Sequence, residues 1–304
     1  MQEAPPGITM IDTLLAGRPG ITTAYLVDGP RPALVDPGAR TTAAVVRAAL
    51  ASRGMGPDDL AWIVPTHVHL DHCGATGILA HAFPRATVVV HERGARHLAE
   101  PGRLLAGSVA VYRHRWSIYG GIDPTPAERI VAAPDGHRID LGGGGALRLL
   151  HTPGHARHHA SLLHEGSGAV IAGDAVGVRM AGAGLHPALP PPDVDPAAGD
   201  ASLARLAALD PTALLLAHSG PSPDPRADID LARRQLALCA EAARATSGRP
   251  ALAARLDVDL PIAPVVGDPG AVGLWGMLGW RDDLVEGLAL WADGTRTAEA
   301  DARQ

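Results

Sequence analysis

The chain has 304 residues, of which 46% are hydrophobic, and its formal net charge at pH 7 is −6. This length and apolar content predict a globular protein with a sizeable core, built as one large α/β domain or as a domain with an appended extension. Because the net charge is acidic and no long basic run occurs, we expect neither nucleic acid nor a membrane as a partner.

The first six residues lack the basic and apolar regions of a secretory signal, and no apolar run reaches the length of a membrane span. We therefore expect a cytoplasmic protein. The two cysteines, Cys73 and Cys239, do not suffice for a disulfide framework. Cys73 follows a histidine cluster, where we expect a small residue at a helix start; a spare metal ligand and a redox-sensitive thiol are the alternatives.

Three short apolar runs near the N-terminus, residues 8–12, 21–27 and 32–36, predict β-strands. The turn-prone sequence Asp28-Gly29-Pro30 separates the last two, which predicts an antiparallel beginning. Asp36 ends the third run, and a helical pattern follows it. Its carboxylate is therefore expected near a strand terminus, where sites in α/β sheets collect, although an aspartate that caps a turn has the same pattern.

The stretch 66–74 places His67, His69, Asp71 and His72 directly after an apolar run. Neutral imidazoles and a carboxylate suit zinc and other first-row divalent ions, and a cluster without thiolates is not typical of a structural zinc finger. In an extended loop His67 and His69 point to one side, whereas Asp71 and His72 lie where the chain turns into the next helix. One loop is thus predicted to serve two adjacent metal ions; the alternative is a solvated polar loop.

A helix at 74–83, a strand at 86–91 and a helix at 92–99 are expected next, and residues 101–135 then break this alternation. The stretch 101–135 predicts a loop-and-helix insert. It is the longest irregular stretch that carries aromatic and cationic side chains, so we expect it to form one wall of a substrate pocket.

The insert contributes four candidates for substrate contact. Tyr112 and Tyr119 are candidates to hydrogen-bond an oxyanion or a leaving group, and Arg113 or Arg115 to meet a substrate carboxylate. The alternative is that Trp116 and its neighbours pack against the C-terminal tryptophans, within one chain or across a dimer interface.

Three later apolar runs end in candidate ligands. The first leads into the tight turn Thr152-Pro153-Gly154, which presents His155 at the end of a strand. The second ends in Asp174 and the third in His218. His159, shortly after the turn, is a candidate to support a ligand or to contact the substrate.

The C-terminal part is predicted to be mainly helical after an irregular loop at 180–199. We expect helices at 201–209 and 228–246. Leu284, Leu288 and Trp291 then follow at i, i+4 and i+7, which predicts one more helix packed on the body or on a second subunit. We therefore divide the chain into a domain at 1–246 and a C-terminal extension at 247–304 packed on it, with a homodimer as an open alternative.

The pattern His-x-His-x-Asp-His at 67–72, followed in order by the turn that ends in His155, by Gly173-Asp174 and by His218, resembles the metallo-β-lactamase-like hydrolase superfamily. The resemblance covers about residues 20–220 and is strongest to the glyoxalase-II-like and lactonase-like branches. It implies a four-layer αβ/βα sandwich with two mixed sheets face to face, helices outside and all ligands at one edge. The ligands it implies are His67, His69 and His155 for one ion, Asp71, His72 and His218 for a second, and Asp174 as the bridge.

The resemblance also implies the chemistry. Two divalent ions, zinc first with iron or manganese as alternatives, share a water, lower its pKa and polarise a carbonyl or phosphoryl oxygen. Asp71 or Asp174 would orient the attacking oxygen, and Asp36 would hold the histidine loop. The predicted function is a dinuclear hydrolase that uses a metal-bridging hydroxide on an ester, thioester or lactone of a small molecule.

Rival functions remain open. In a branch similar to persulfide dioxygenases, a single iron is held by the equivalents of His67, His155 and Asp174. A non-enzymatic scaffold that merely retains the metal loop is the third interpretation. Glutathione thioesters are disfavoured because glyoxalase II recognises glutathione with basic residues that include a lysine, and this chain contains none.

Overall fold

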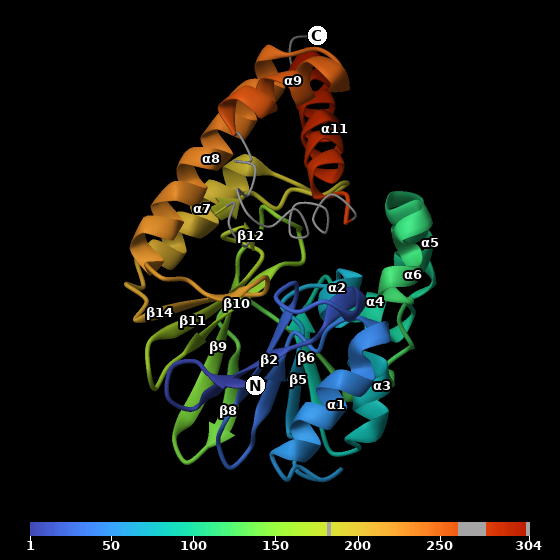
Figure 1. Cartoon of the computed structure of the whole chain (residues 1–304), viewed down its shortest axis with the longest axis vertical. Coiled ribbons are helices and arrows are strands. Elements are labelled where there is room, and N and C mark those ends of the chain that lie inside the picture. The colour runs from blue at the N-terminus through green and yellow to red at the C-terminus, as the bar shows by residue number, and fades with distance from the viewer. Residues whose placement is uncertain (181–183, 261–277, 302–304) are drawn as a thin grey trace.

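The computed structural model describes residues 1–180, 184–260 and 278–301. Two mixed β-sheets face each other in the lower half of Figure 1. Helices lie along the outer face of the first sheet, and others pack on the upper part of the second. This arrangement confirms the predicted αβ/βα sandwich with a helical C-terminal extension. The extension lies at the upper end of the molecule, above the edge of the sandwich where the candidate ligands gather.

The first sheet contains seven strands in chain order. They run antiparallel from β1 to β4 and parallel from β4 to β7, so the predicted antiparallel beginning is confirmed. The strands are β1 (Gln2–Glu3), β2 (Ile8–Asp12), β3 (Thr23–Val27), β4 (Ala33–Val35), β5 (Trp62–Val64), β6 (Thr87–His91) and β7 (Ile130–Ala133).

The second sheet has the order β15-β14-β11-β10-β9-β8, with β11 and β14 parallel and the other neighbours antiparallel. A separate hairpin joins β12 (Val178–Met180) to β13 (Gly184–His186). The strands of the second sheet are β8 (Arg138–Gly142), β9 (Gly145–His151), β10 (Ala160–His164), β11 (Ala169–Gly173), β14 (Ala213–Leu216) and β15 (Gly220–Pro221).

Alternating side chains along each strand divide the core into layers, as the two-residue period of a strand requires. Val89 of β6 lies in the cluster between the two sheets, whereas Val88 and Val90 lie in the cluster under the helices of the first sheet. The Tyr25 hydroxyl donates to the Leu216 carbonyl at 2.6 Å and so links the two sheets across this core.

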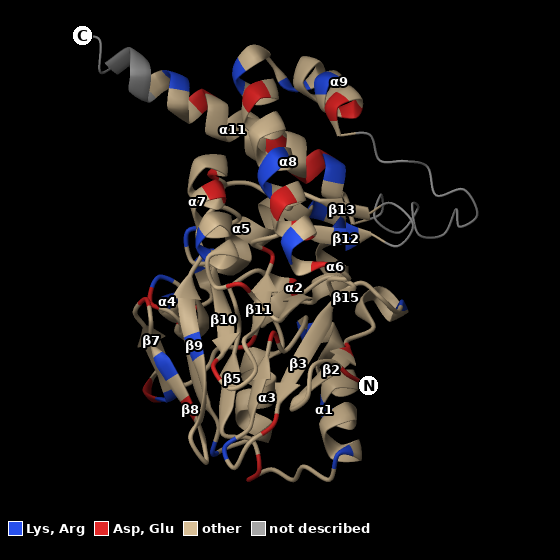
Figure 2. Cartoon of the chain, turned by 90° about the vertical axis from the view of Figure 1, so that its left-hand side faces the viewer, with Lys and Arg blue, Asp and Glu red and all other residues tan. Residues whose placement is uncertain are grey.

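Helices α1 (Ala43–Ser52) and α3 (Thr76–Ala82) cover the first sheet, and α7 (Pro196–Ala207) and α8 (Pro225–Ala245) cover the second. The described part of the extension contains α9 (Arg249–Asp259) and α11 (Trp280–Asp301), which share a buried apolar cluster with α8. The boundary between 246 and 247 stays a prediction. Figure 2 shows acidic and basic residues interspersed along α8 and α9. None of the described helices is long and apolar enough to cross a membrane.

Two stretches expected to be irregular contain regular elements. The insert at 101–135 contains α5 (Gly102–Tyr112), a 3-10 turn (Arg113–Arg115), α6 (Trp116–Tyr119) and, contrary to prediction, strand β7, which pairs in parallel with β6. In the loop predicted at 180–199, α7 already begins at Pro196. The Asp195 carboxylate accepts the N–H groups of Ala197 and Ala198, and proline at the first helical position favours this start.

Candidate metal centre

All seven predicted ligands lie together at one edge of the sandwich. His67 and His69 belong to the loop after β5, and the short helix α2 (Leu70–Cys73) carries the next two. The remaining three follow the ends of β9, β11 and β14. The ligand atoms form three groups, each within 4.8 Å: His67, His69 and His155; His67, His72 and Asp174; Asp71, His72 and His218.

Three imidazole nitrogens converge in the first group. His67 Nε2 lies 3.0 Å from His69 Nδ1 and 3.2 Å from His155 Nε2, and His155 Nε2 lies 2.9 Å from His69 Nδ1. The outer bonds fix two of the tautomers. His155 Nδ1–H donates to the Ala188 carbonyl at 2.7 Å, so its Nε2 atom carries a lone pair. Without a cation, the lone pairs of these nitrogens would repel one another. A cation among the three nitrogens removes this repulsion.

The other outer bond involves Thr66. Its hydroxyl donates to Asp36 Oδ2 at 3.1 Å, so His67 Nδ1–H, at 3.0 Å from the same hydroxyl oxygen, is the donor in that second contact. His67 Nε2 therefore also carries a lone pair. Metal-binding histidines in proteins are commonly oriented in this way by a partner on the outer ring nitrogen.

In the other two groups, imidazole nitrogens face carboxylates. His72 Nδ1–H donates to Asp36 Oδ2 at 3.2 Å, which turns Nε2 toward Asp71 and Asp174, each with an oxygen 3.5 Å away. His218 Nδ1–H donates to the Ile21 carbonyl at 2.8 Å, and His218 Nε2 lies 3.4 Å from Asp174 Oδ1 and 3.7 Å from Asp71 Oδ2. A lone pair that faces a carboxylate is favourable only when a cation or a proton lies between them.

Two atoms of these two groups are buried and lack a hydrogen-bond partner among the described residues: His72 Nε2 and Asp174 Oδ1. Buried polar atoms are normally paired, because leaving one unpaired costs about 1–3 kcal/mol. Coordination of a divalent ion removes this cost. The donor set and its geometry therefore fit divalent cations.

Electrostatics favours the metal-binding protonation states of three candidate ligands. Burial, reinforced by the neighbouring histidines, lowers the pKa of His67 and of His69 well below the usual range. Burial raises the pKa of Asp71, but His72 and His218 outweigh it and bring the value to about 2. These residues are therefore neutral imidazoles and an ionised carboxylate at pH 7, the forms that bind metals.

Asp36 lies beneath the histidine loop. Its carboxylate accepts the Thr66 N–H at 2.7 Å and the Thr66 hydroxyl, and it also accepts His72 Nδ1–H. Asp36 is buried and adopts a φ of 49°, which an aspartate tolerates better than most residues. One carboxylate thus ties the start of the loop to a candidate ligand at its end.

His159 lies beneath Asp174. Its Nε2 atom accepts the Asp174 N–H at 3.0 Å, and its Nδ1–H donates to the Thr152 hydroxyl at 2.9 Å. Gly173 makes this approach possible, because a Cβ at that position would lie 2.6 Å from His159 Nε2 and its φ is +54°. His159 is fully buried and both of its ring nitrogens are hydrogen-bonded within the chain, which favours support of Asp174 over contact with a substrate.

His158 also belongs to the site, although the sequence did not single it out. Its ring is stacked over that of His67 at a centroid distance of 6.3 Å, and its Nδ1 atom accepts the Val68 N–H at 3.4 Å. Burial, together with His155 and His97, lowers its pKa to about 3. The only signal in the sequence was the doublet His158-His159. The supporting carbonyls of Ile21 and Ala188 gave no signal, because every residue carries one.

The insert brings two tyrosines together. The rings of Tyr112 and Tyr119 lie 4.4 Å apart. Burial raises the pKa of both hydroxyls, and the Asp71 carboxylate adds to this increase.

Arg113 lies in the 3-10 turn with a φ of 51°. The expectation that Arg115 meets a substrate carboxylate was wrong, because its guanidinium donates to Asp283 and to the Leu278 carbonyl.

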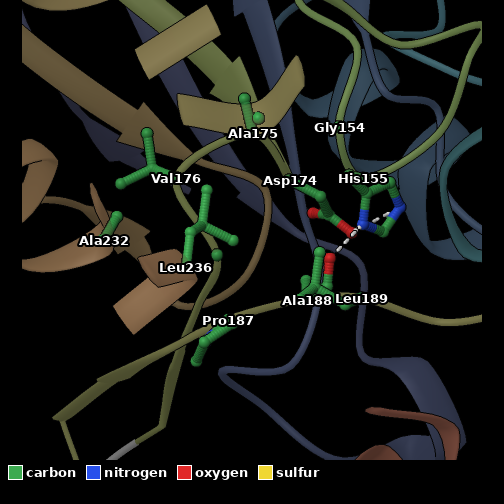
Figure 3. Close-up of a pocket in the computed structure, with 12 residues that line it drawn as sticks. Gly154, His155, Asp174, Ala175, Val176, Pro187, Ala188, Leu189, Ala232 and Leu236 are labelled. Carbon is green, nitrogen blue, oxygen red and sulfur yellow. Dashed lines mark hydrogen bonds and ion pairs between the residues drawn. The ribbon is translucent and has the colours of Figure 1, made fainter. Parts of the chain in front are cut away.

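A small pocket adjoins His155 and Asp174 on the side of α8 (Figure 3). Its other walls are mostly apolar and include Val176, Leu189 and Leu236. None of the residues 101–135, all of which the structure describes, lines it. The predicted contribution of the insert to a substrate pocket therefore stays a prediction, separate from this pocket.

Residues 17–218 match the family model described as the metallo-beta-lactamase superfamily. The chain is 32% identical over 167 residues to the metallo-beta-lactamase fold-containing protein ST1585 of Sulfurisphaera tokodaii, which covers 54% of this chain and 62% of that relative, less than two thirds of its length. It is 32% identical over 248 residues to a hydroxyacylglutathione hydrolase of Acidiphilium cryptum, across 79% of this chain and 84% of the relative. It is also 32% identical over 111 residues to the N-acyl homoserine lactonase AttM of Azorhizobium caulinodans, across 36% and 38% of the two chains.

The crystal structure of ST1585 superposes on this chain with a TM-score of 0.70 at 24% identity, covering 93% of this chain and 98% of that one. This likeness supports the fold. Because the family model covers well over half of the sequence, the chain belongs to the metallo-β-lactamase superfamily.

Proposed function

We propose that the protein is a metal-dependent hydrolase that binds two divalent ions and cleaves an ester, thioester or lactone bond of a small molecule. The observation that carries this proposal is the position of Asp174. Its Oδ2 atom lies 4.0 Å from His67 Nε2 and 3.5 Å from the Nε2 atoms of His155 and His72, and its Oδ1 atom lies 3.4 Å from His218 Nε2. A carboxylate between two groups of imidazoles is the expected position of a bridging ligand.

The ligand assignment follows from these groups. His67, His69 and His155 would hold the first ion, Asp71, His72 and His218 the second, and Asp174 both. Zinc suits a set of imidazoles and carboxylates, and iron and manganese are the alternatives. A single-iron site of the persulfide-dioxygenase type would leave Asp71, His72 and His218 without a role, although their ligand atoms converge as closely as the others.

A pair of bound divalent ions supplies a Lewis acid and a water of lowered pKa. The chain supplies the remaining functions. The side chain of Asp71 is 16% exposed and that of Asp174 only 5%, so Asp71 is the carboxylate on the open side, where it would orient the attacking water. The hydroxyls of Tyr112 and Tyr119 are donors for the oxyanion or for the leaving group.

The substrate panel begins with the chemistry that two relatives are named for, a hydroxyacyl thioester of glutathione and an N-acyl homoserine lactone. We place the neutral lactone and simple esters first, because the chain has no lysine to meet the carboxylates of glutathione. The test is elemental analysis of the purified protein combined with kinetics on thioesters, lactones, esters and phosphodiesters. Hydrolysis that a chelator abolishes and zinc restores supports the proposal. Oxygen uptake with a glutathione persulfide, without hydrolysis, would replace it by the single-iron alternative.

A further inference from the structure

The C-terminal helix α11 contacts a loop that belongs to the metal centre. The indole Nε1–H of Trp280, the first residue of α11, donates to the Pro187 carbonyl at 2.9 Å. The indole also packs edge-on against the His186 ring, with centroids 5.3 Å apart. The start of the helix is thus bonded to the chain that runs from β13 past the site.

About two turns further along α11, the backbone of the helix lies directly on the same loop. A Cβ at Gly287 would lie 2.2 Å from the Leu189 carbonyl oxygen, far inside van der Waals contact, so only glycine fits there. Leu284 and Leu288, on either side of Gly287, lie in the same buried cluster as Leu189. The loop 187–189 therefore has its position fixed by a hydrogen bond at one end and by close packing at the other.

The same loop orients a candidate ligand. Between the two contact points, the Ala188 carbonyl accepts His155 Nδ1–H at 2.7 Å, as the dashed line in Figure 3 shows. This bond fixes the tautomer in which His155 Nε2 presents a lone pair to His67 and His69. Removing such outer partners from metal-binding histidines typically weakens metal affinity about 10- to 100-fold.

We propose that Trp280 and Gly287 are positioning residues of the metal site formed by His67, His69 and His155. Through the loop 187–189, α11 sets the metal affinity of this site. Helix α11 lies outside residues 17–218, which match the family model, so this control is a property of the extension. The inference rests on the proposed function only in requiring that the chain binds metal. It does not depend on which substrate is cleaved.

Four variants of the full chain test the inference, two at the contact and two matched controls on the same helix. Trp280→Phe keeps the aromatic ring and removes the N–H donor, and Gly287→Ala displaces the loop. The controls are Trp291→Phe, whose ring packs under Arg244 at 5.0 Å, and Gly294→Ala, where a Cβ has no neighbour within 4 Å. Zinc is titrated against a chromophoric chelator, and the thermal midpoint of each variant is measured in the presence of zinc.

We expect Trp280→Phe and Gly287→Ala to weaken one of the two zinc sites about 10-fold and to leave the other unchanged, with both controls like the wild type. Should Gly287→Ala fail to fold, Trp280→Phe decides alone. Wild-type affinity in Trp280→Phe overturns the inference, and so does an equal weakening of both sites, which is what general destabilisation would produce. If the wild-type protein binds two zinc ions but hydrolyses no substrate, the proposed hydrolase function is refuted and the inference about α11 stands. If the wild-type protein binds no zinc, both proposals are refuted.

Discussion

Arg115 and Asp283 form a two-point ion pair between the insert and the C-terminal helix. Nη2 lies 2.7 Å from Oδ1 and Nη1 lies 2.8 Å from Oδ2, and both side chains are largely buried. The pair joins segments that lie far apart in the sequence. It also explains why Arg115 is not free to meet a substrate.

Asp283→Ala should therefore destabilise the protein. The Arg115 guanidinium would stay buried without its counter-charge. Such a loss costs about 3–5 kcal/mol for a fully buried pair, and we expect about 2–4 kcal/mol for this largely buried pair. Asp282→Ala, at an exposed position next to it, is the control and should cost less than about 0.5 kcal/mol. Urea unfolding measures both values. Equal effects of the two substitutions would show that the ion pair adds nothing to stability.

His159→Ala should slow turnover while both metals remain bound. The imidazole holds Asp174 through its backbone N–H and touches neither proposed metal position directly in the described contacts. Loss of such support typically lowers activity about 10- to 100-fold. Steady-state kinetics and metal content of the same preparation test this. Loss of both metals in this variant would mean that His159 is itself a ligand.

Tyr25→Phe tests the link between the two sheets. The substitution keeps the ring in the core and removes the hydroxyl that donates to Leu216, so a buried carbonyl loses its partner. We expect a loss of about 1–3 kcal/mol in the free energy of unfolding, measured by denaturant titration. An unchanged midpoint would show that the carbonyl finds another donor.

The stacked pair of His91 and His151 should make the protein sensitive to acid. The rings lie 3.6 Å apart at the ends of β6 and β9, and burial, with His151 and Arg93 nearby, lowers the pKa of His91 to about 4. An unfolded histidine has a pKa near 6.5. As the pH falls from about 6.5 toward 4, the unfolded chain therefore takes up a proton that the folded chain does not, and stability decreases.

His91→Phe keeps a flat ring and cannot titrate. When the pH falls from 7 to 5, the free energy of unfolding of His91→Phe should decrease by about 1–2 kcal/mol less than that of the wild type. The comparison of two proteins removes the contribution of all other titrating groups. Identical pH profiles in denaturant titrations would contradict the assignment.

The sequence predicted those parts of the fold and the site that depend on local patterns. The strand-end residues His155, Asp174 and His218 were found because each follows an apolar run. Strand β7 was missed, because the run Ile130–Ala133 is short and forms a strand only beside β6. Arg113 and Arg115 could not be distinguished in advance, since burial of Arg115 depends on α11. The carbonyls that orient His155 and His218 come from loops whose paths only the tertiary structure defines.

The bridging role of Asp174 is the centre of the proposed function, and the metal content of Asp174→Ala tests it most directly. The wild type and the control Asp230→Ala, at an exposed position of α8, are expected to bind two equivalents of zinc per chain. Asp174→Ala should fold, bind less than one equivalent after dialysis and show no chelator-sensitive hydrolysis, because both ions lose a shared ligand. Retention of two tightly bound equivalents by the folded Asp174→Ala protein would contradict the bridging assignment.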